Sequence, residues 1–224
     1  TGHLAGVGCL RHEQNMITFV LVEGNIGAGK SSLLHELEKR GQRVMYEPVK
    51  QWEEGNLLQL MYSKKLHMAV FQQTAVQTRW SIIVNVLLHG QDGVVFLERS
   101  PFSDKEVFAA INVTGEAEMA AYGVMHRSMM SSIVDNPHAP TRWMTVLLDT
   151  DATTAQERVT KRDRKSETSK DAKEFRDYLE RIGDAHDVMF DKIPWCKTRI
   201  DVSTILPSQV ADAVLDFVTS SITK

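Results

Sequence analysis

The residues from Gly24 to Ser32 have the types and the spacing needed to bind phosphate. They fit the pattern G-x-x-x-x-G-K-[ST], in which glycines let backbone N–H groups turn inward around an anion. Lys30 is expected to reach the β- and γ-phosphates of a nucleoside triphosphate, and Ser31 to bind Mg²⁺. Glycine-rich turns also occur for packing alone, but every fixed position of the motif is present. The predicted nucleotide-binding residues are Gly24, Asn25, Ile26, Gly27, Ala28, Gly29, Lys30, Ser31 and Ser32.

The elements that must position this loop alternate between strand and helix patterns. An apolar run over 17–22 precedes the loop, and a helical pattern over 33–39 follows it. Further strands are predicted over 43–49, 94–100, 143–148 and 198–202. Helices are predicted over 66–89, 104–111 and 116–134, from 153, over 171–190 and after Pro207. This rhythm predicts an α/β fold of the P-loop kinase type, with about five parallel strands flanked by helices. One domain is expected over 17–224, after a disordered tail or leader over 1–16.

Charged residues follow the second and third predicted strands. Because ligands of such sheets collect at the carboxyl ends of the strands, Glu47, Glu98 and Arg99 should lie near the γ-phosphate. Glu98 is placed to sit beside Mg²⁺ with Ser31, and Glu47 to take a proton from an attacking hydroxyl. Arg99 is placed to hold the acceptor. A single charged strand end is usually a solvated edge, but beside a phosphate-binding loop the catalytic interpretation is favoured.

A basic segment follows the fourth predicted strand. Five of the eight residues from Arg158 to Lys165 are positively charged. Such a segment can be a solvated helix end, but the clustering favours an arginine-rich lid, over about 158–170, that closes on triphosphate. Its arginines are Arg158, Arg162 and Arg164, of which Arg158 and Arg162 are four residues apart and share a helix face.

The composition argues against polyanionic and membrane partners. The chain has 224 residues and a net charge of -3, which offers no overall field for nucleic acid or for an anionic membrane. No apolar run approaches the roughly 20 residues that span a bilayer. Cys9 and Cys196 match no metal-ligand spacing and are typical of a reducing compartment. We expect a cytoplasmic protein, with a mitochondrial location as the alternative.

These motifs together resemble the deoxynucleoside kinase family. The resemblance rests on the phosphate-binding loop, on Glu-Pro-Val-Lys-Gln-Trp over 47–52, on Phe71-Gln72, on Glu98-Arg99-Ser100 and on the basic segment, in order from 17 to 190. It implies transfer of the ATP γ-phosphate to the 5′-hydroxyl of a deoxynucleoside, with Mg²⁺ as cofactor. The residues it implies for catalysis are Glu47 as general base, Arg99, Lys30, Arg158 and Arg162. It also implies that Arg158, Arg162 and Arg164 are the lid arginines that contact the phosphates and the purine of ATP.

The resemblance also implies a set of residues that bind the deoxynucleoside. Tyr62 and Glu167 bind its 3′-hydroxyl, Gln72 hydrogen-bonds the base edge, and Trp52 and Phe108 wall the base. For lone aromatic side chains, core packing is the ordinary alternative. The full predicted set is Glu47, Trp52, Met61, Tyr62, Phe71, Gln72, Ala75, Arg79, Arg99, Asp104, Phe108 and Glu167.

The expected base preference follows from one helix face. Gln72, Ala75 and Arg79 are spaced to face one way, and Asp104 is placed to pair with Arg79 across the base pocket. Within the family, this combination resembles the purine and deoxycytidine kinases, because a charged pair disfavours the 5-methyl group of thymine. We expect deoxyadenosine or deoxyguanosine as substrate, deoxycytidine next, and thymidine poor.

Two other functions remain open from the sequence. A nucleoside monophosphate kinase shares the sheet and the lid, although the acidic Glu47 argues against an anionic acceptor. A non-catalytic nucleotide-binding module must explain away Glu47, Arg99 and the basic segment together. The patterns at 66–89 and 116–134, with Met119, Met125, Met129 and Met130, fit a homodimer or tetramer, and equally fit packing within one subunit.

Overall fold

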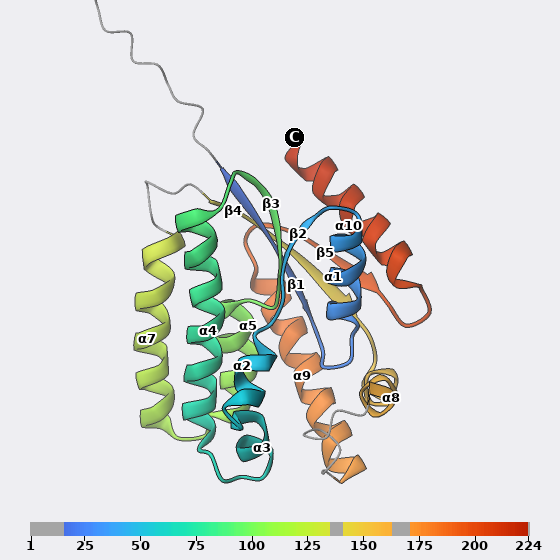
Figure 1. Cartoon of the computed structure of the whole chain (residues 1–224). Coiled ribbons are helices and arrows are strands. Elements are labelled where there is room, and N and C mark those ends of the chain that lie inside the picture. The colour runs from blue at the N-terminus through green and yellow to red at the C-terminus, as the bar shows by residue number, and fades with distance from the viewer. Residues whose placement is uncertain (1–15, 135–140, 163–170, 224) are drawn as a thin grey trace, which may run out of the picture.

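The centre of the molecule is a parallel sheet whose strand order is β2-β3-β1-β4-β5. This computed structural model describes residues 16–134, 141–162 and 171–223. The strands are β1 (Ile17–Gly24), β2 (Arg43–Met45), β3 (Gly93–Glu98), β4 (Thr141–Asp149) and β5 (Cys196–Asp201). The predicted α/β fold with five parallel strands is confirmed. Because β1 lies between β3 and β4, the loop that follows it emerges at the middle of the sheet (Figure 1).

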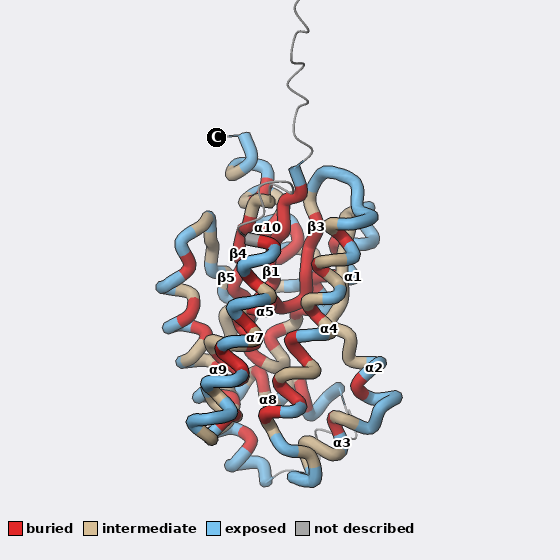
Figure 2. Tube along the Cα trace, turned by 90° about the vertical axis from the view of Figure 1, so that its left-hand side faces the viewer, coloured by how far each residue is buried: buried red, intermediate tan, exposed pale blue. Residues whose placement is uncertain are grey.

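Helices cover both faces of this sheet. Val20 and Val22 of β1 face α1 (Lys30–Lys39) and α10 (Pro207–Ile222), whereas Phe19 and Leu21 face α4 (Met68–His89) and α7 (Glu116–Val134). This alternation along β1 is the period of two expected of a strand buried on both sides. Figure 2 shows β1, β3 and β4 buried in the interior, while the helices are buried on one side and exposed on the other.

The remaining helices surround the carboxyl ends of the strands. They are α2 (Val49–Glu54), α3 (Leu57–Tyr62), α5 (Pro101–Ser103), the π-helix η1 (Asp104–Ala109), α6 (Ala110–Asn112), α8 (Ala152–Arg162) and α9 (Ala172–Lys192). The long helix α9 (Figure 1) packs against α8 and η1. None of the helices in the described ranges is long and apolar enough to cross a membrane.

Two predicted elements differ from the structure. The strand predicted over 43–49 ends at Met45, because Pro48 has no N–H to donate to a neighbouring strand and instead caps α2, a helix the sequence did not predict. The helix predicted over 104–111 begins as a π-helix. Such short π-helical turns occur frequently at functional sites, and this one carries Asp104 and Phe108.

Candidate functional site

The phosphate-binding loop has a shape that only glycine permits at two positions. Gly24 and Gly27 have φ angles of +139° and +86°. A Cβ on Gly24 would lie 2.5 Å from the carbonyl oxygen of Leu148, and one on Gly27 would lie 2.4 Å from that of Ala155. The glycines therefore let the loop lie directly against β4 and α8. The loop ends at Gly29, where α1 begins with its amide groups directed outward from the helix end.

Lys30 is buried at the start of α1 and contacts the loop itself. Its Nζ donates to the carbonyl oxygens of Gly24, at 3.1 Å, and of Asn25, at 2.7 Å. Burial and the neighbouring Arg99 lower the pKa of Lys30 to about 7. Its charge therefore depends on the anions near it.

Ser31 and Glu98, the two predicted metal ligands, lie in direct contact. The Ser31 hydroxyl donates to Oε1 of Glu98 at 2.7 Å, and the backbone N–H of Glu47 donates to Oε2 at 3.4 Å. This pair offers hard oxygen ligands of the kind that Mg²⁺ prefers. In the part of the chain that the structure describes, no three His, Cys, Asp or Glu side chains are arranged to hold a metal ion. A cation here would take its other ligands from phosphate and water.

Arg99 connects the phosphate-binding loop to the end of β2. Its Nη1 donates to the carbonyl oxygen of Gly24 at 3.0 Å, and its Nε lies 3.5 Å from Oε1 of Glu47. Its guanidinium lies 4.5 Å from the centre of the Phe108 ring. The φ angle of Arg99 is +66°, which is uncommon for a residue with a side chain and is found mainly where the surroundings enforce it.

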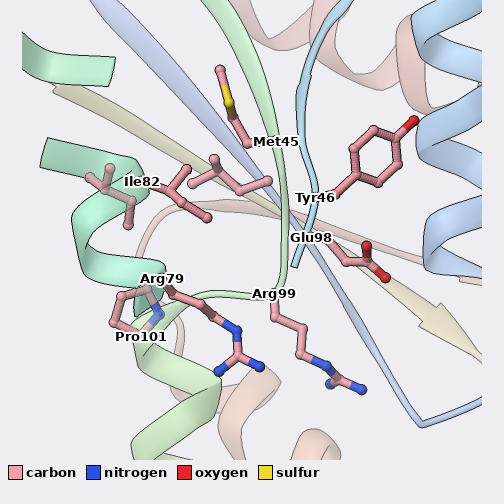
Figure 3. A pocket seen from close by; sticks show the side chains of 9 residues that line it. Met45, Tyr46, Arg79, Ile82, Glu98, Arg99 and Pro101 are labelled. Atoms are coloured by element: carbon pink, nitrogen blue, oxygen red, sulfur yellow. The ribbon is translucent and has the colours of Figure 1, made fainter. Parts of the chain in front are cut away.

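Glu47 and Asp104 are joined by one arginine. Arg79 of α4 donates to Oε1 of Glu47 through Nη2 and to Oδ1 of Asp104 through Nη1. The predicted pair of Arg79 with Asp104 is confirmed, and the bridge to Glu47 was not predicted. Figure 3 shows Arg79 and Arg99 extending past the same end of the strands. The crevice behind them holds about 10 Å³, room for at most one water molecule.

These neighbours decide the charge of Glu47. Burial raises its pKa, but Arg79, Arg99 and Lys30 outweigh burial and lower the pKa of Glu47 to about 2. Glu47 is therefore ionised throughout the physiological range. Gln72 and Ala75 are buried on the same face of α4 as Arg79, as their spacing predicted.

Of the predicted aromatic residues, Trp52 and Phe71 are buried in one core cluster beside Arg79, whereas Phe108 lies in another cluster, against Arg99. Trp52 is 3% exposed, meets Phe71 edge to face at 5.6 Å and lies 5.1 Å from the Arg79 guanidinium. Its Nε1 donates to Oγ1 of Thr78 at 3.1 Å. Met61 and Tyr62 pack against this cluster. These contacts are those of core packing, so a role in walling the base stays a prediction for Trp52 and Phe108.

A cleft of about 1070 Å³ runs from Glu47 past the phosphate-binding loop to the segment between β5 and α10. Arg158 and Arg162 line it, as do Ile205, Pro207 and Val210. Arg158 donates to the carbonyl oxygens of Val202, at 2.7 Å, and Ser203, at 3.1 Å, rather than to the phosphate-binding loop. Arg164, Glu167 and the rest of the predicted lid after Arg162 lie outside the described residues. Neither Arg79 nor Asp104 lines the cleft in the described ranges.

The sequence did not predict three features of this site. The apolar cleft wall at Ile205 and Val210 has no local signature. The other two features are Glu23 and His186, which are buried side by side below the phosphate-binding loop. Glu23 lies in the apolar strand before the loop, and His186 lies on the apolar face of α9. Glu23 and His186 could have been found from the sequence, because each is a titratable residue at a position where the pattern requires an apolar one.

Known proteins with similar sequences were found along almost the whole chain. A family model for deoxynucleoside kinases matches residues 20–223, which extends past 190, where the resemblance noted in the sequence ended. A probable deoxycytidine kinase of fowlpox virus is 42% identical over 91 residues, covering 40% of this chain and 38% of that protein. Deoxycytidine kinase 2 of Gallus gallus is 28% identical over 236 residues, covering 91% and 85%. A thymidine kinase of Ictalurid herpesvirus 1 is 31% identical over 210 residues, covering 87% and 81%.

Proposed function

The chain belongs to the deoxynucleoside kinase family, and from this we propose that it transfers the γ-phosphate of ATP to the 5′-hydroxyl of purine deoxynucleosides and deoxycytidine. One observation carries the proposal beyond the family. Arg79 joins Glu47, beside the phosphate-binding loop, to Asp104, which is fully buried. The group that activates the hydroxyl and the group that selects the base are thus in contact with the same side chain.

On the acceptor side, Glu47 would accept the proton of the 5′-hydroxyl. With a pKa of about 2, Glu47 is a weak proton acceptor, but phosphoryl transfer depends mainly on positioning and charge stabilisation. A nucleoside base that engages Asp104 and Arg79 would draw Arg79 away from Glu47. Since Arg79 is the first of the groups that lower the pKa of Glu47, this movement would raise that pKa. Binding of the correct base would thereby make Glu47 a stronger proton acceptor.

On the donor side, the phosphate-binding loop and Lys30 would hold the β- and γ-phosphates. Ser31 and Glu98 would hold Mg²⁺, which offsets the charge of the transferring group when bound. Arg99 would stabilise that group from the opposite side, because it lies between Gly24 and Glu47. The apolar residues Ile205 and Val210 give the far end of the cleft a surface suited to the purine of ATP.

The proposed base preference rests on charge. The Arg79–Asp104 pair offers donors and an acceptor to the edge of adenine, guanine or cytosine, and it disfavours the thymine methyl group. Several relatives, among them those from fowlpox virus and Gallus gallus, are named deoxycytidine kinases, which supports deoxycytidine as a substrate beside the purines.

We further propose a homodimer formed through α4 and α7. The methionines of α7 pack against α4 within one subunit and give no support. Support comes from three apolar side chains of α4 and α7 that a partner subunit would cover, Val70, Leu88 and Val124, which are 47%, 71% and 60% exposed. Light scattering during gel filtration would reveal the mass of the assembly.

For the compartment we propose the cytoplasm, with the mitochondrion as the alternative. Imaging a tagged chain would decide between them.

The test is phosphate transfer from ATP to each of the common deoxynucleosides, with and without Mg²⁺, in the wild type and in Glu47→Gln. We expect purine and deoxycytidine products, and a loss of kcat of about 100-fold or more in the variant. Glu54→Gln, at the exposed end of the adjacent helix α2, is the matched control and should be unaffected. Thymidine as best substrate would contradict the base preference, and reaction of monophosphates alone would contradict the acceptor site.

A further inference from the structure

A buried carboxyl group and a buried imidazole face each other below the phosphate-binding loop. Glu23, in β1, is 1% exposed, and His186, in α9, is 2% exposed. Oε2 of Glu23 and Nε2 of His186 lie 3.9 Å apart. Within residues 16–134, 141–162 and 171–223, neither atom has a hydrogen-bond partner. Buried polar atoms are nearly always hydrogen-bonded, so this pair requires an explanation.

The other atoms of the two side chains fix where hydrogens lie. Nδ1 of His186 lies 2.8 Å from the carbonyl oxygen of Ile182, and a carbonyl only accepts, so Nδ1 carries a hydrogen. In a neutral imidazole, Nε2 is then an acceptor. Oε1 of Glu23 accepts from the hydroxyl of Ser100. If Glu23 were ionised, two acceptors would face each other across 3.9 Å with no proton between them.

The surrounding charges favour keeping a proton on Glu23. Arg79 and Arg99 supply two permanent positive charges to the site, and Lys30 adds a third when it is protonated. Three carboxylates already balance them, those of Glu47, Glu98 and Asp104.

An ionised Glu23 would be a fourth carboxylate in this group. Burial raises the pKa of Glu23, although Ser100, Arg99, Ser103 and Lys30 oppose that rise. Burial, Arg99 and Lys30 lower the pKa of His186 to about 3, against the opposing hydrogen bond to Ile182. The carboxyl group therefore holds the proton more readily than the imidazole does.

We propose that Glu23 is a neutral carboxylic acid that donates a hydrogen bond to Nε2 of His186, and that this pair positions Ser100 and Arg99 for phosphoryl transfer. The second clause rests on the proposed function, whereas the first does not. Closing the O–H···N contact from 3.9 Å requires a movement of about 1 Å.

A neutral group suits this position. Glu23 directly precedes Gly24, whose carbonyl oxygen accepts from both Lys30 and Arg99. A carboxylate at this place would compete for those cations and repel a triphosphate. As an acid, Glu23 leaves Arg99 to Glu47 and to the phosphoryl group, while its bond to Ser100 holds the turn in which Arg99 takes a positive φ angle. Glu23 and His186 are thus positioning residues.

The first test measures protons directly. In the full chain with ¹⁵N-labelled histidine, the His186 signals are identified by their loss in His186→Phe. We expect a neutral ring with hydrogen on Nδ1 and an accepted hydrogen bond at Nε2, unchanged between about pH 6 and 9. An imidazolium, hydrogen on Nε2 in the neutral ring, or titration within that range would overturn the first clause whatever reaction the protein catalyses.

The second test compares two replacements of Glu23. Glu23→Gln keeps a donor towards His186 and an acceptor towards Ser100, so it should retain at least about a third of kcat. Glu23→Leu has similar size without either group and should lose about 100-fold in kcat, with the KM for ATP changed less than about threefold.

The matched control is Glu180→Gln, an exposed position on α9, the helix that carries His186. A folded Glu23→Gln variant that loses as much kcat as Glu23→Leu would overturn the proposal, because an ionised Glu23 would then be required. Thermal unfolding of each variant separates loss of fold from loss of positioning. If the wild type phosphorylates no deoxynucleoside, the proposed function fails while the NMR result still decides the proton.

Discussion

The acceptor half and the donor half of the site are held in place by different means. In the acceptor half, Arg79, Arg99 and Asp104 are buried, and they pair with Glu47 and with one another. In the donor half, the glycine loop offers backbone amides, and Arg158 and Arg162 come from the C-terminal half of α8, whose inner face buries Ala155 and Val159. The acceptor half therefore has its geometry fixed by ion pairs within the core, whereas the donor half has its geometry fixed by the backbone of the loop and by side chains of α8 that are partly or fully exposed. Changes in the first should affect kcat, and changes in the second should affect the KM for ATP.

Among the changes that test this division, the largest expected effect comes from Arg99→Lys. Lysine keeps the charge but cannot reach the carbonyl oxygen of Gly24 and Glu47 with separate nitrogens as Arg99 does. We expect kcat to fall about 100-fold, with the KM for ATP changed less than about threefold. Arg127→Lys, exposed on α7, is the control and should behave as the wild type. If Arg99→Lys instead raises the KM for ATP and leaves kcat unchanged, the division between the two halves is wrong.

A smaller effect is expected when the base-selecting pair is replaced. Arg79→Met combined with Asp104→Ala removes one charge of each sign, so that Glu47 keeps Arg99 as its partner and no new uncompensated charge is buried. The ratio of thymidine to deoxyadenosine turnover should rise by about 10-fold or more. Steady-state kinetics with both nucleosides measure this ratio, and a ratio equal to that of the wild type would show that the pair does not select the base.

What could be predicted from the sequence follows the same division. The phosphate-binding loop is a contiguous motif, and helical spacing places Arg79 on the face of Gln72 and Ala75, so both were found. The pairing of Arg79 with Asp104 was expected because Asp104 closely follows the Glu98-Arg99-Ser100 motif and because the family resemblance implies such a pair. The bridge from Arg79 to Glu47 was missed because it depends on α2 and α3, which return the chain to α4 and which no strong pattern predicts. Arg158 was expected at the triphosphate, but its contacts with Val202 and Ser203 depend on where β5 ends. Such pairings between distant segments follow from tertiary packing rather than local sequence.

Lys30, in the donor half, also lowers the pKa of Glu47 in the acceptor half, and it gives a prediction about protons. Because its pKa is about 7, Lys30 is mostly neutral at about pH 8, where a free lysine is charged. A triphosphate favours the charged form, so nucleotide binding should take up close to one proton at about pH 8 and much less at about pH 6. Calorimetry in buffers of different ionisation enthalpy measures this number.

The control for this experiment is Lys30→Met, which should bind nucleotide more weakly and take up no proton. Equal proton uptake at both pH values in the wild type would mean that Lys30 is already charged before nucleotide binds. The loop and α1 would then present a permanent cation.

The smallest effect is expected in the donor half, at Arg158→Gln. This change removes the hydrogen bonds from α8 to the carbonyl oxygens of Val202 and Ser203, beside the apolar wall of the cleft. We expect the KM for ATP to rise about threefold to fivefold, since loss of these bonds loosens the wall rather than removing a reacting group, and stability to fall by about 1 kcal/mol. The control is Arg176→Gln. Arg176 also donates to α8, at Gln156, but away from the cleft, so this change should leave the KM for ATP unchanged. A loss of kcat as large as that of Arg99→Lys would mean that Arg158 leaves these carbonyls and acts on the transferring phosphate, so that the donor half is assembled during turnover.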